Sequence, residues 1–183
     1  MSGQVNVAAR LKSCPAEAET RGMFFLDSLG AINELGADVS KYPRFQAFRM
    51  YPQRTFIEIA AEAAAAAYPN LPLKEGLRRL GQKAYPTFGE SVAGRVMFGV
   101  LGHDLGAVLK LVPRGYAAVV SHATAELIDA TPRQMTVRLN NVQTFLDSYQ
   151  VGVFEGAIVA CREQGEVFVR LDSPTTGDFH IVW

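Results

Sequence analysis

MTVRLN, residues 135–140, alternates apolar and polar side chains with a period of two. This period is typical of a β-strand that buries one face and exposes the other. The same alternation recurs in residues 166–171 and 178–183, and a weaker version covers Ala123 to Asp129. The C-terminal part of the chain is therefore expected to form four half-buried strands.

The segment between the second and third of these strands has a helical period instead. An amphipathic helix is predicted from Thr144 to Arg162. The connections within each strand pair are short, as at Thr131-Pro132, and short connections require antiparallel pairing. The expected order is strand, strand, helix, strand, strand.

Upstream of Gly115 the apolar residues recur at helical spacing. The first predicted helix starts at Gly22 and stops at Gly36, and capping-box patterns at residues 55–58 and 87–90 begin two more. Further helices are predicted over residues 72–83 and 104–112, the latter stopped by Pro113. The alanine run at residues 63–67 lets backbones approach closely, so its helix is expected to be central or at an interface.

These elements predict an α+β fold, in which an N-terminal helical layer packs on a C-terminal four-stranded antiparallel sheet (β-β-α-β-β). Residues 1–20 are expected to be a leader or edge segment. Residues 21–183 are expected to form a single α+β domain.

Composition argues against several classes of protein. The chain has 183 residues, of which 49% are hydrophobic, and its 18 basic residues balance 18 acidic ones. A duplex-binding protein would show a basic excess, and a membrane span would need an apolar run of about 20 residues. Two cysteines, Cys14 and Cys161, fit a reducing compartment, and no signal-peptide core is visible. A cytoplasmic protein without a nucleic-acid partner or a membrane span is expected.

No motif in the sequence supplies a reaction centre. The G-x-S-x-G elbow of serine hydrolases and the glycine-rich phosphate loops are absent. His103, His122 and His180 have no partners at the spacing of a zinc site. Cys161 is expected at the C-terminal end of a helix, where no helix dipole activates a thiol. We therefore expect a non-enzymatic protein with no metal site and no cofactor.

Glycines are unusually frequent in the predicted helices, where each costs about 1 kcal/mol relative to alanine. They are Gly89, Gly94, Gly99, Gly102, Gly106, Gly152 and Gly156. One interpretation is close packing between helices, and the other is an apolar ligand pocket. The residues proposed for that pocket are Phe98, Leu101, Leu105, Phe145, Tyr149 and Phe154.

The run YPNLPLKEGLRRLG, residues 68–81, resembles a family of paralogous myxobacterial proteins of unknown function. Phe88, residues 94–96 and 154–156, Gly152, Val167 and Trp183 extend the resemblance over residues 21–183. The family carries no assigned activity, so the resemblance implies no functional residues.

The order of elements is similar to that of a wider fold group. This group holds haem nitric-oxide/oxygen-binding domains, four-vinyl-reductase-type ligand domains and transport protein particle subunits. Its haem members place a proximal histidine on a helix ahead of the sheet, and His103 stands near that place. They also carry a Tyr-x-Ser-x-Arg signature that residues 136–140 lack. The transport protein particle subunits, which tether vesicles, dimerise through helices and can hold an acyl chain in a cavity.

The leading hypothesis is a non-enzymatic regulatory or sensor module in signalling. It would bind a small apolar ligand or a protein partner, as a homodimer. One alternative is a haem-based gas sensor with His103 as the proximal ligand. The other is an oligomeric scaffold or tethering subunit whose interface is the helix of Ala63 to Ala67.

Overall fold

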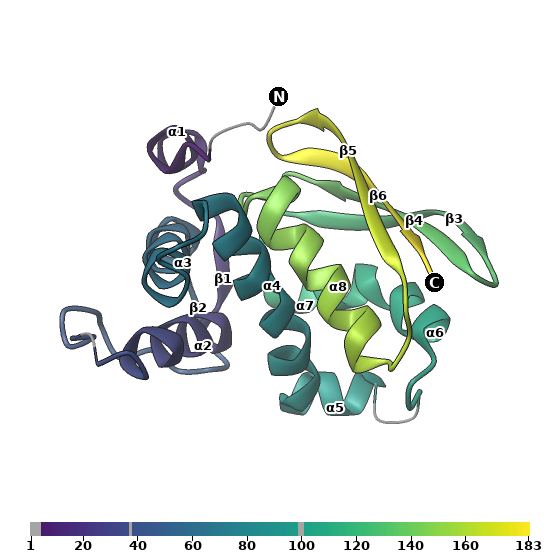
Figure 1. Cartoon of the computed structure of the whole chain (residues 1–183), viewed down its shortest axis with the longest axis horizontal. Helices are drawn as coiled ribbons and strands as arrows, with labels where there is room; N and C mark the ends of the chain where they lie inside the picture. Colours follow the sequence, from purple (N-terminus) through teal and green to yellow (C-terminus); the bar gives the residue numbers. More distant parts are fainter. Residues whose placement is uncertain (1–4, 37, 99–100) are drawn as a thin grey trace.

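The computed structural model describes residues 5–36, 38–98 and 101–183 (Figure 1). Its first half is helical except for two short strands: α1 (Val7–Ser13), β1 (Glu19–Arg21), α2 (Gly22–Asn33), β2 (Met50–Pro52), α3 (Gln53–Ala67), α4 (Leu73–Glu90), α5 (Val92–Phe98), α6 (Leu105–Lys110) and α7 (Val112–Val119). The second half holds β3 (Thr124–Thr131), β4 (Gln134–Asn140), a π-helical turn η1 (Leu146–Gln150), α8 (Val151–Ala160), β5 (Glu166–Ser173) and β6 (Thr176–Val182).

The four C-terminal strands form one antiparallel sheet in the order β3-β4-β6-β5. The two edge strands, β3 and β5, each contain an irregularity in register, between Leu127 and Asp129 and between Leu171 and Ser173. Along the central strands the predicted alternation places Val137, Leu139 and Phe179 on the buried face, each with no exposed surface. The α+β class and the β-β-α-β-β order predicted from the sequence are confirmed.

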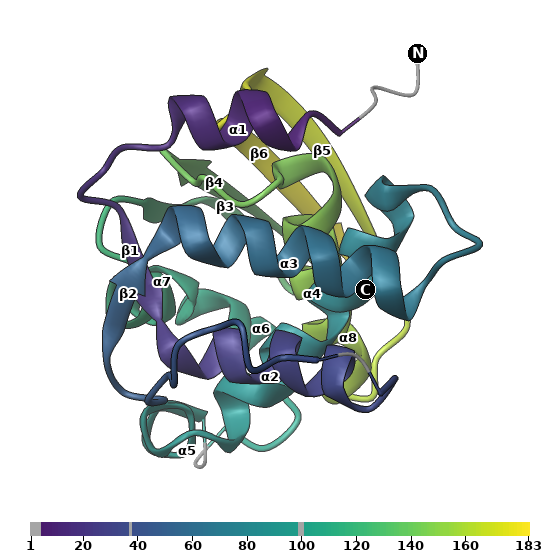
Figure 2. The same cartoon turned by 90° about the vertical axis from the view of Figure 1, so that its left-hand side faces the viewer.

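Two hydrophobic cores hold the fold together. One lies between the inner face of the sheet and α6 and α8, and includes Leu109, Phe154 and Phe179. The other lies among α2, α3 and α4 and includes Phe25, Ile57 and Leu77. Figure 2 shows α1, α3 and α2 lying roughly parallel on the side of the molecule away from the sheet. Within the described ranges, no helix combines the length and apolar character needed to cross a membrane.

Helices α4 and α8 approach so closely that only glycine fits at the contact. A Cβ atom at Gly152 would lie 1.9 Å from the carbonyl oxygen of Arg78, and in the adjoining turn η1 the carbonyl oxygen of Tyr149 would lie 2.0 Å from a Cβ atom at Gly81 of α4. At Gly156 it would lie 2.2 Å from the carbonyl oxygen of Gln82. Close packing, the first of the two interpretations, therefore accounts for Gly152 and Gly156. Gly89, by contrast, has nothing within 4 Å of its Cβ position.

Helix α4 also runs without a break from Leu73 to Glu90, where two helices, over residues 72–83 and from the capping box at 87–90, were expected. Pro86 lies inside α4, and a proline has no N–H to donate to the carbonyl oxygen of Gln82. The Cα of Gly156 packs against that oxygen instead. The capping box predicted at Thr87 does not form, because its hydroxyl donates back to the carbonyl oxygen of Lys83 at 3.0 Å.

Two other helix boundaries differ from the sequence predictions. Helix α3 begins at Gln53 rather than at Thr55, directly after β2, and has no side-chain cap. Pro113 does not end a helix but stands in the first turn of α7, where its missing N–H leaves no hydrogen bond unmade. The helix before it is capped by Asp104, whose carboxylate accepts from the N–H of Ala107 at 2.9 Å.

The first two residues of the alanine run lie inside the chain's own helical layer, whereas Ala65 is exposed. Ala63 and Ala64 have no exposed surface, and a Cβ at Gly76 of α4 would lie 3.0 Å from the carbonyl oxygen of Ala64. These small side chains bring α3 and α4 into close contact. A charge at Ala64 would therefore disturb the core, and it would not report on an oligomeric interface.

The partly buried carboxylate of Glu155 in α8 strengthens the contact with α4. Arg78 Nε donates to Glu155 Oε2 at 2.9 Å, and Gln82 Nε2 donates to the same oxygen at 3.0 Å. Burial raises the pKa of Glu155, but the hydrogen bonds from Arg78 and Gln82 outweigh it, so the pKa lies below its usual value. The ionised carboxylate is therefore the form that stabilises the helix pair.

Replacing Glu155 with glutamine is expected to destabilise the protein by about 1 kcal/mol at pH 7, because Arg78 is partly exposed and water screens the pair. A depressed carboxyl pKa gives stability that is present above the unfolded value, about 4.3, and lost as the pH falls through the folded one. The difference in the free energy of unfolding between Glu155→Gln and the parent, measured by urea denaturation, should therefore shrink below about pH 4. Glu58→Gln, at an exposed position of α3, is the control. A difference that stays constant with pH would contradict this assignment.

Candidate functional site

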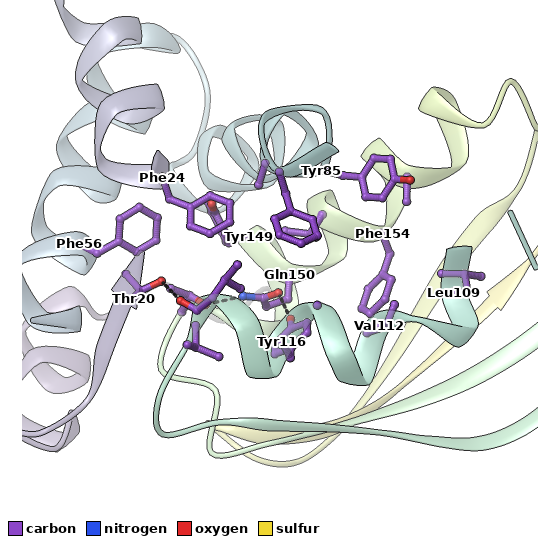
Figure 3. A pocket seen from close by; sticks show the side chains of 18 of the residues that line it. Thr20, Phe24, Phe56, Tyr85, Leu109, Val112, Tyr116, Tyr149, Gln150 and Phe154 are labelled. Atoms are coloured by element: carbon purple, nitrogen blue, oxygen red, sulfur yellow. Dashed lines mark hydrogen bonds between the residues drawn. The ribbon is translucent and has the colours of Figure 1, made fainter. Parts of the chain in front are cut away.

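A cavity of about 110 Å³ lies between the helical layer and the helices that cover the sheet (Figure 3). None of the four strands of the large sheet lines it. Its wall is made by Thr20, Phe24, Gln53, Phe56, Ala84, Tyr85, Phe88, Val108, Leu109, Val112, Gly115, Tyr116, Val119, Val120, Thr144, Tyr149, Gln150, Val153, Phe154 and Ala157. These residues come from segments spread between Thr20 and Ala157 along the chain.

The cavity lies where the two hydrophobic cores meet. Phe56 and Tyr149 belong to the core of the helical layer, whereas Leu109 and Phe154 belong to the core beneath the sheet. Figure 3 shows Phe24, Phe56 and Tyr149 at one end and Leu109 and Phe154 at the other. A ligand in the cavity would therefore contact both cores at once.

The lining is apolar and contains no Asp, Glu, Lys or Arg side chain. Three tyrosines line it, and burial raises the pKa of Tyr85, Tyr116 and Tyr149 well above the usual value. Each phenol therefore stays protonated and neutral at physiological pH. The cavity offers a ligand apolar surface and uncharged hydrogen-bonding groups.

A short chain of hydrogen bonds crosses one wall of the cavity. The hydroxyl of Tyr116 donates to Oε1 of Gln150, whose Nε2 donates to Oγ1 of Thr144. The hydroxyl of Thr20 donates to the carbonyl oxygen of Val119 at 3.1 Å. These bonds satisfy polar groups that would otherwise be costly to bury, and they tie β1 and η1 to α7.

The π-helical turn explains how two adjacent polar residues both reach the cavity. In η1 the N–H of Gln150 donates to the carbonyl oxygen of Phe145, five residues back, at 3.2 Å. The wider turn changes the direction of successive side chains relative to an α-helix, and such turns are frequent at functional sites. Tyr149 and Gln150 thus both line the cavity.

The structure brings two of the six proposed pocket residues, Tyr149 and Phe154, onto the cavity wall. Leu105 is buried in the core beneath the sheet, and Phe145 is buried in the core of the helical layer. Leu101 is half-buried and packs against the former core, and the side chain of Phe98 lies outside the described residues. The helical-layer side of the cavity, from Thr20 to Phe56, was absent from the sequence-based proposal.

His103 lies on the surface and does not face the cavity. It is exposed, and its Nδ1 is 3.2 Å from the carbonyl oxygen of Ala160. Across the residues with described positions, no group of three or more His, Cys, Asp or Glu side chains could hold a metal ion.

A second hollow, of about 430 Å³, lies between α2 and α4. It is lined by Asp27, Tyr68, Arg79, Gln82, Lys83, Pro86, Thr87 and Glu90. Burial raises the pKa of Asp27, and Thr87 and Lys83 partly offset this effect. Charges of both signs share an open cleft, without a nucleophile or a metal-binding set among them. The apolar cavity is the stronger candidate.

The fold is shared with solved structures of H-NOX proteins. The H-NOX protein from K. algicida, in its Fe(II) unliganded form, superposes with a TM-score of 0.62 at 10% identity, over 88% of this chain and 95% of that one. The Shewanella woodyi H-NOX, bound to IWP-051 in the Fe(II)CO state, gives 0.60 at 14% identity, over 88% and 93%. The S. oneidensis H-NOX, in the Fe(II)NO state, gives 0.56 at 15% identity, over 88% and 97%. At such identities the likeness shows the fold alone.

Sequence comparison adds a family but no activity. Residues 16–183 match the model of a family described as "Protein of unknown function (DUF2378)". None of the curated proteins matches the chain.

The expectation that no cofactor is involved is overturned by these comparisons. Proteins of the same fold are described as Fe(II) H-NOX proteins, and a further matching structure concerns haem distortion in the H-NOX family. Haem is thus bound by other proteins that share this fold.

The described residues do not fit haem in their present positions. Pockets for drug-sized ligands measure roughly 300–1,000 Å³, and this cavity has about 110 Å³. No His, Cys or Met side chain lines it, and the imidazole of His103 is turned to the surface. Burial of the three phenols opposes the phenolate form in which tyrosine would ligate iron.

Proposed function

Since this chain belongs to the family of proteins of unknown function DUF2378, which supplies no activity, we propose from its geometry that it is a sensor module. Its signal would be a small apolar ligand in the cavity between the two cores. The observation that carries the proposal is the position of that cavity, whose wall is shared by both cores. Likeness to the H-NOX fold supports a role in ligand binding.

A ligand at this position would change how firmly the two layers are held together. It would contact Phe56 and Tyr149 on one side and Leu109 and Phe154 on the other. A ligand that binds one arrangement of the layers better than another shifts the population toward it by the difference in binding free energy. The sensor would therefore act through the relative position of the helical layer and the sheet.

Filling the cavity provides the test. Gly115 of α7 lines it, and a Cβ there would meet only Phe88, at an ordinary 3.7 Å. Gly115→Leu is expected to retain the fold, because leucine favours helix and enters existing space, and to reduce cavity binding at least tenfold. Binding of xenon, which enters dry apolar cavities, is followed by ¹²⁹Xe NMR and by amide shifts in ¹H–¹⁵N spectra.

The matched control is Gly30→Leu in α2, where the added Cβ meets nothing within 4 Å and no wall of the cavity is touched. It should bind xenon as the parent does. The proposal fails if the parent chain shows no saturable xenon binding, or if Gly115→Leu binds it unchanged.

Haem binding is the second candidate, and the H-NOX likeness is the observation that favours it. It would require the cavity to widen and His103 to turn inward. The absorption spectrum of the chain after haem addition decides between the candidates. A Soret band that changes in His103→Ala supports this candidate, and a spectrum of free haem alone removes it.

The homodimer, the protein partner and the cytoplasmic location expected from the sequence remain predictions, since the structure holds one chain. Sizing chromatography with multi-angle light scattering measures the first of them directly.

A further inference from the structure

We propose that the cavity selects an uncharged ligand that carries one hydrogen-bonding group, such as a short-chain alcohol, and that Gln53 and Tyr149 hold that group. This inference rests on the proposed ligand-binding function and gives the chemical class of its ligand. It follows from two polar side chains on the cavity wall that have no hydrogen-bond partner among the described residues.

Gln53 is the first of these side chains. Only 2% of the residue is exposed, and it lines the cavity. Its backbone N–H donates to the carbonyl oxygen of Ala18 at 2.7 Å, which fixes the start of α3. Its carboxamide has no hydrogen-bond partner within the described part of the chain. The carboxamide atoms keep some access to the cavity, so a ligand there would supply the partner that the described residues do not.

Tyr149 is the second. It is 5% exposed, its hydroxyl makes no hydrogen bond to any described residue, and its ring meets Phe56 edge-on at 5.8 Å between centroids. Phe56 lies one helical turn after Gln53 on the same face of α3. Gln53 and Tyr149 therefore both lie near Phe56 on the cavity wall, at the end where Figure 3 shows Tyr149 beside Phe24 and Phe56.

The other polar groups of the wall are already occupied. Tyr116, Gln150 and Thr144 bond to one another, and Thr20 bonds to the backbone of α7. A ligand would thus find an acceptor and a donor in the Gln53 carboxamide and both in the Tyr149 hydroxyl.

Charge and size narrow the ligand further. A carboxylate or an ammonium would enter a cavity with no opposite charge on its wall, and burying an unpaired charge is strongly unfavourable. A cavity of roughly 150 Å³ accommodates benzene. The present cavity, at about 110 Å³, suits a smaller molecule.

The test uses three probes of similar shape: 1-butanol, 1-chlorobutane and butyrate. Binding to the full chain is measured from amide shifts in ¹H–¹⁵N spectra. We expect 1-butanol to bind and butyrate to bind at least tenfold more weakly. Tyr149→Phe and Gln53→Met should each weaken 1-butanol about five- to tenfold, the effect of losing one net hydrogen bond, and leave 1-chlorobutane unchanged or tighter.

Urea denaturation confirms that both variants fold. Equal weakening of 1-butanol and 1-chlorobutane by the variants would overturn the assigned roles of Tyr149 and Gln53, and butyrate binding as tightly as 1-butanol would overturn the selection for neutral ligands. Both results leave the cavity as an apolar site. Loss of all three probes together with xenon would instead remove the proposed function itself.

Discussion

Replacing Gly152 with alanine is expected to destabilise the protein by about 3 kcal/mol, although alanine favours helix over glycine by about 1 kcal/mol. The added methyl group would lie 1.9 Å from the carbonyl oxygen of Arg78, so α4 and α8 would have to separate. Both helices line the cavity, through Ala84 and Tyr85 on one and Phe154 and Ala157 on the other. Equilibrium urea denaturation measures the loss.

Gly30→Ala is the matched control for this substitution. Gly30 lies within α2, and its Cβ position has nothing within 4 Å. The same chemical change should there stabilise the protein by about 0.5–1 kcal/mol, through helix propensity and the smaller entropy of the unfolded chain. Two effects of the same sign would show that close approach at Gly152 does not control stability.

Replacing Phe25 with alanine is expected to cost about 3–5 kcal/mol. Phe25 has no exposed surface and stacks on Phe45 with ring centroids 4.3 Å apart. It also contacts Phe56 at 5.3 Å and Tyr51 at 5.6 Å between centroids, so its removal leaves an aromatic cluster without its centre. Urea denaturation followed by circular dichroism and by tryptophan fluorescence measures the change.

The two probes of that experiment report on different parts of the fold. Trp183 is the only tryptophan and belongs to the core beneath the sheet, far in sequence from Phe25. If the layers unfold together, both signals should shift equally. Leu26→Ala is the control, because this neighbouring side chain is 43% exposed and should change stability by less than about 0.5 kcal/mol. A loss below 1 kcal/mol at Phe25 would contradict its central role.

The sheet was predictable because a half-buried strand shows its burial directly in the sequence. Met135, Val137 and Leu139 have to alternate with polar residues, and any shift by one position would expose them. A helix between the second and third strands was also predicted, but over Thr144 to Arg162, whereas the segment begins with the π-helical turn η1 and α8 covers only Val151–Ala160. These patterns are local, so they do not depend on which other elements pack against the strands.

The helix boundaries were less predictable because proline is found after the end of one helix and also in the first turn of the next. Pro113 was expected to stop a helix, yet it stands in the first turn of α7, where a missing N–H is harmless. Pro86 lies between two helices expected from the sequence, yet α4 runs through it, and Gly156 of α8 packs close to the carbonyl group of Gln82, which Pro86 has no N–H to bond. That contact joins residues about 70 positions apart, which no local pattern contains.

The cavity was only half predictable. Tyr149 and Phe154 stand out as aromatic residues of one helical segment, but Thr20, Gln53 and Phe56 come from the other end of the chain. Nothing in their neighbourhood marks them, since Gln53 looks like an ordinary residue ahead of a helix. The docking of β1 and α3 against α7 and η1 brings them together, and docking is a property of the whole fold.

The irregularities in β3 and β5 have a consequence for the protein in crowded solution. The two edge strands of an open sheet present unpaired N–H and C=O groups, to which strands of other molecules can add and form fibrils. Here each margin is bent, near Leu127 at one side and near Leu171 at the other, so that a straight incoming strand cannot match its donors and acceptors over the full length. These distortions disfavour the addition of a strand at either edge, although Ile128 and Phe168 are exposed there.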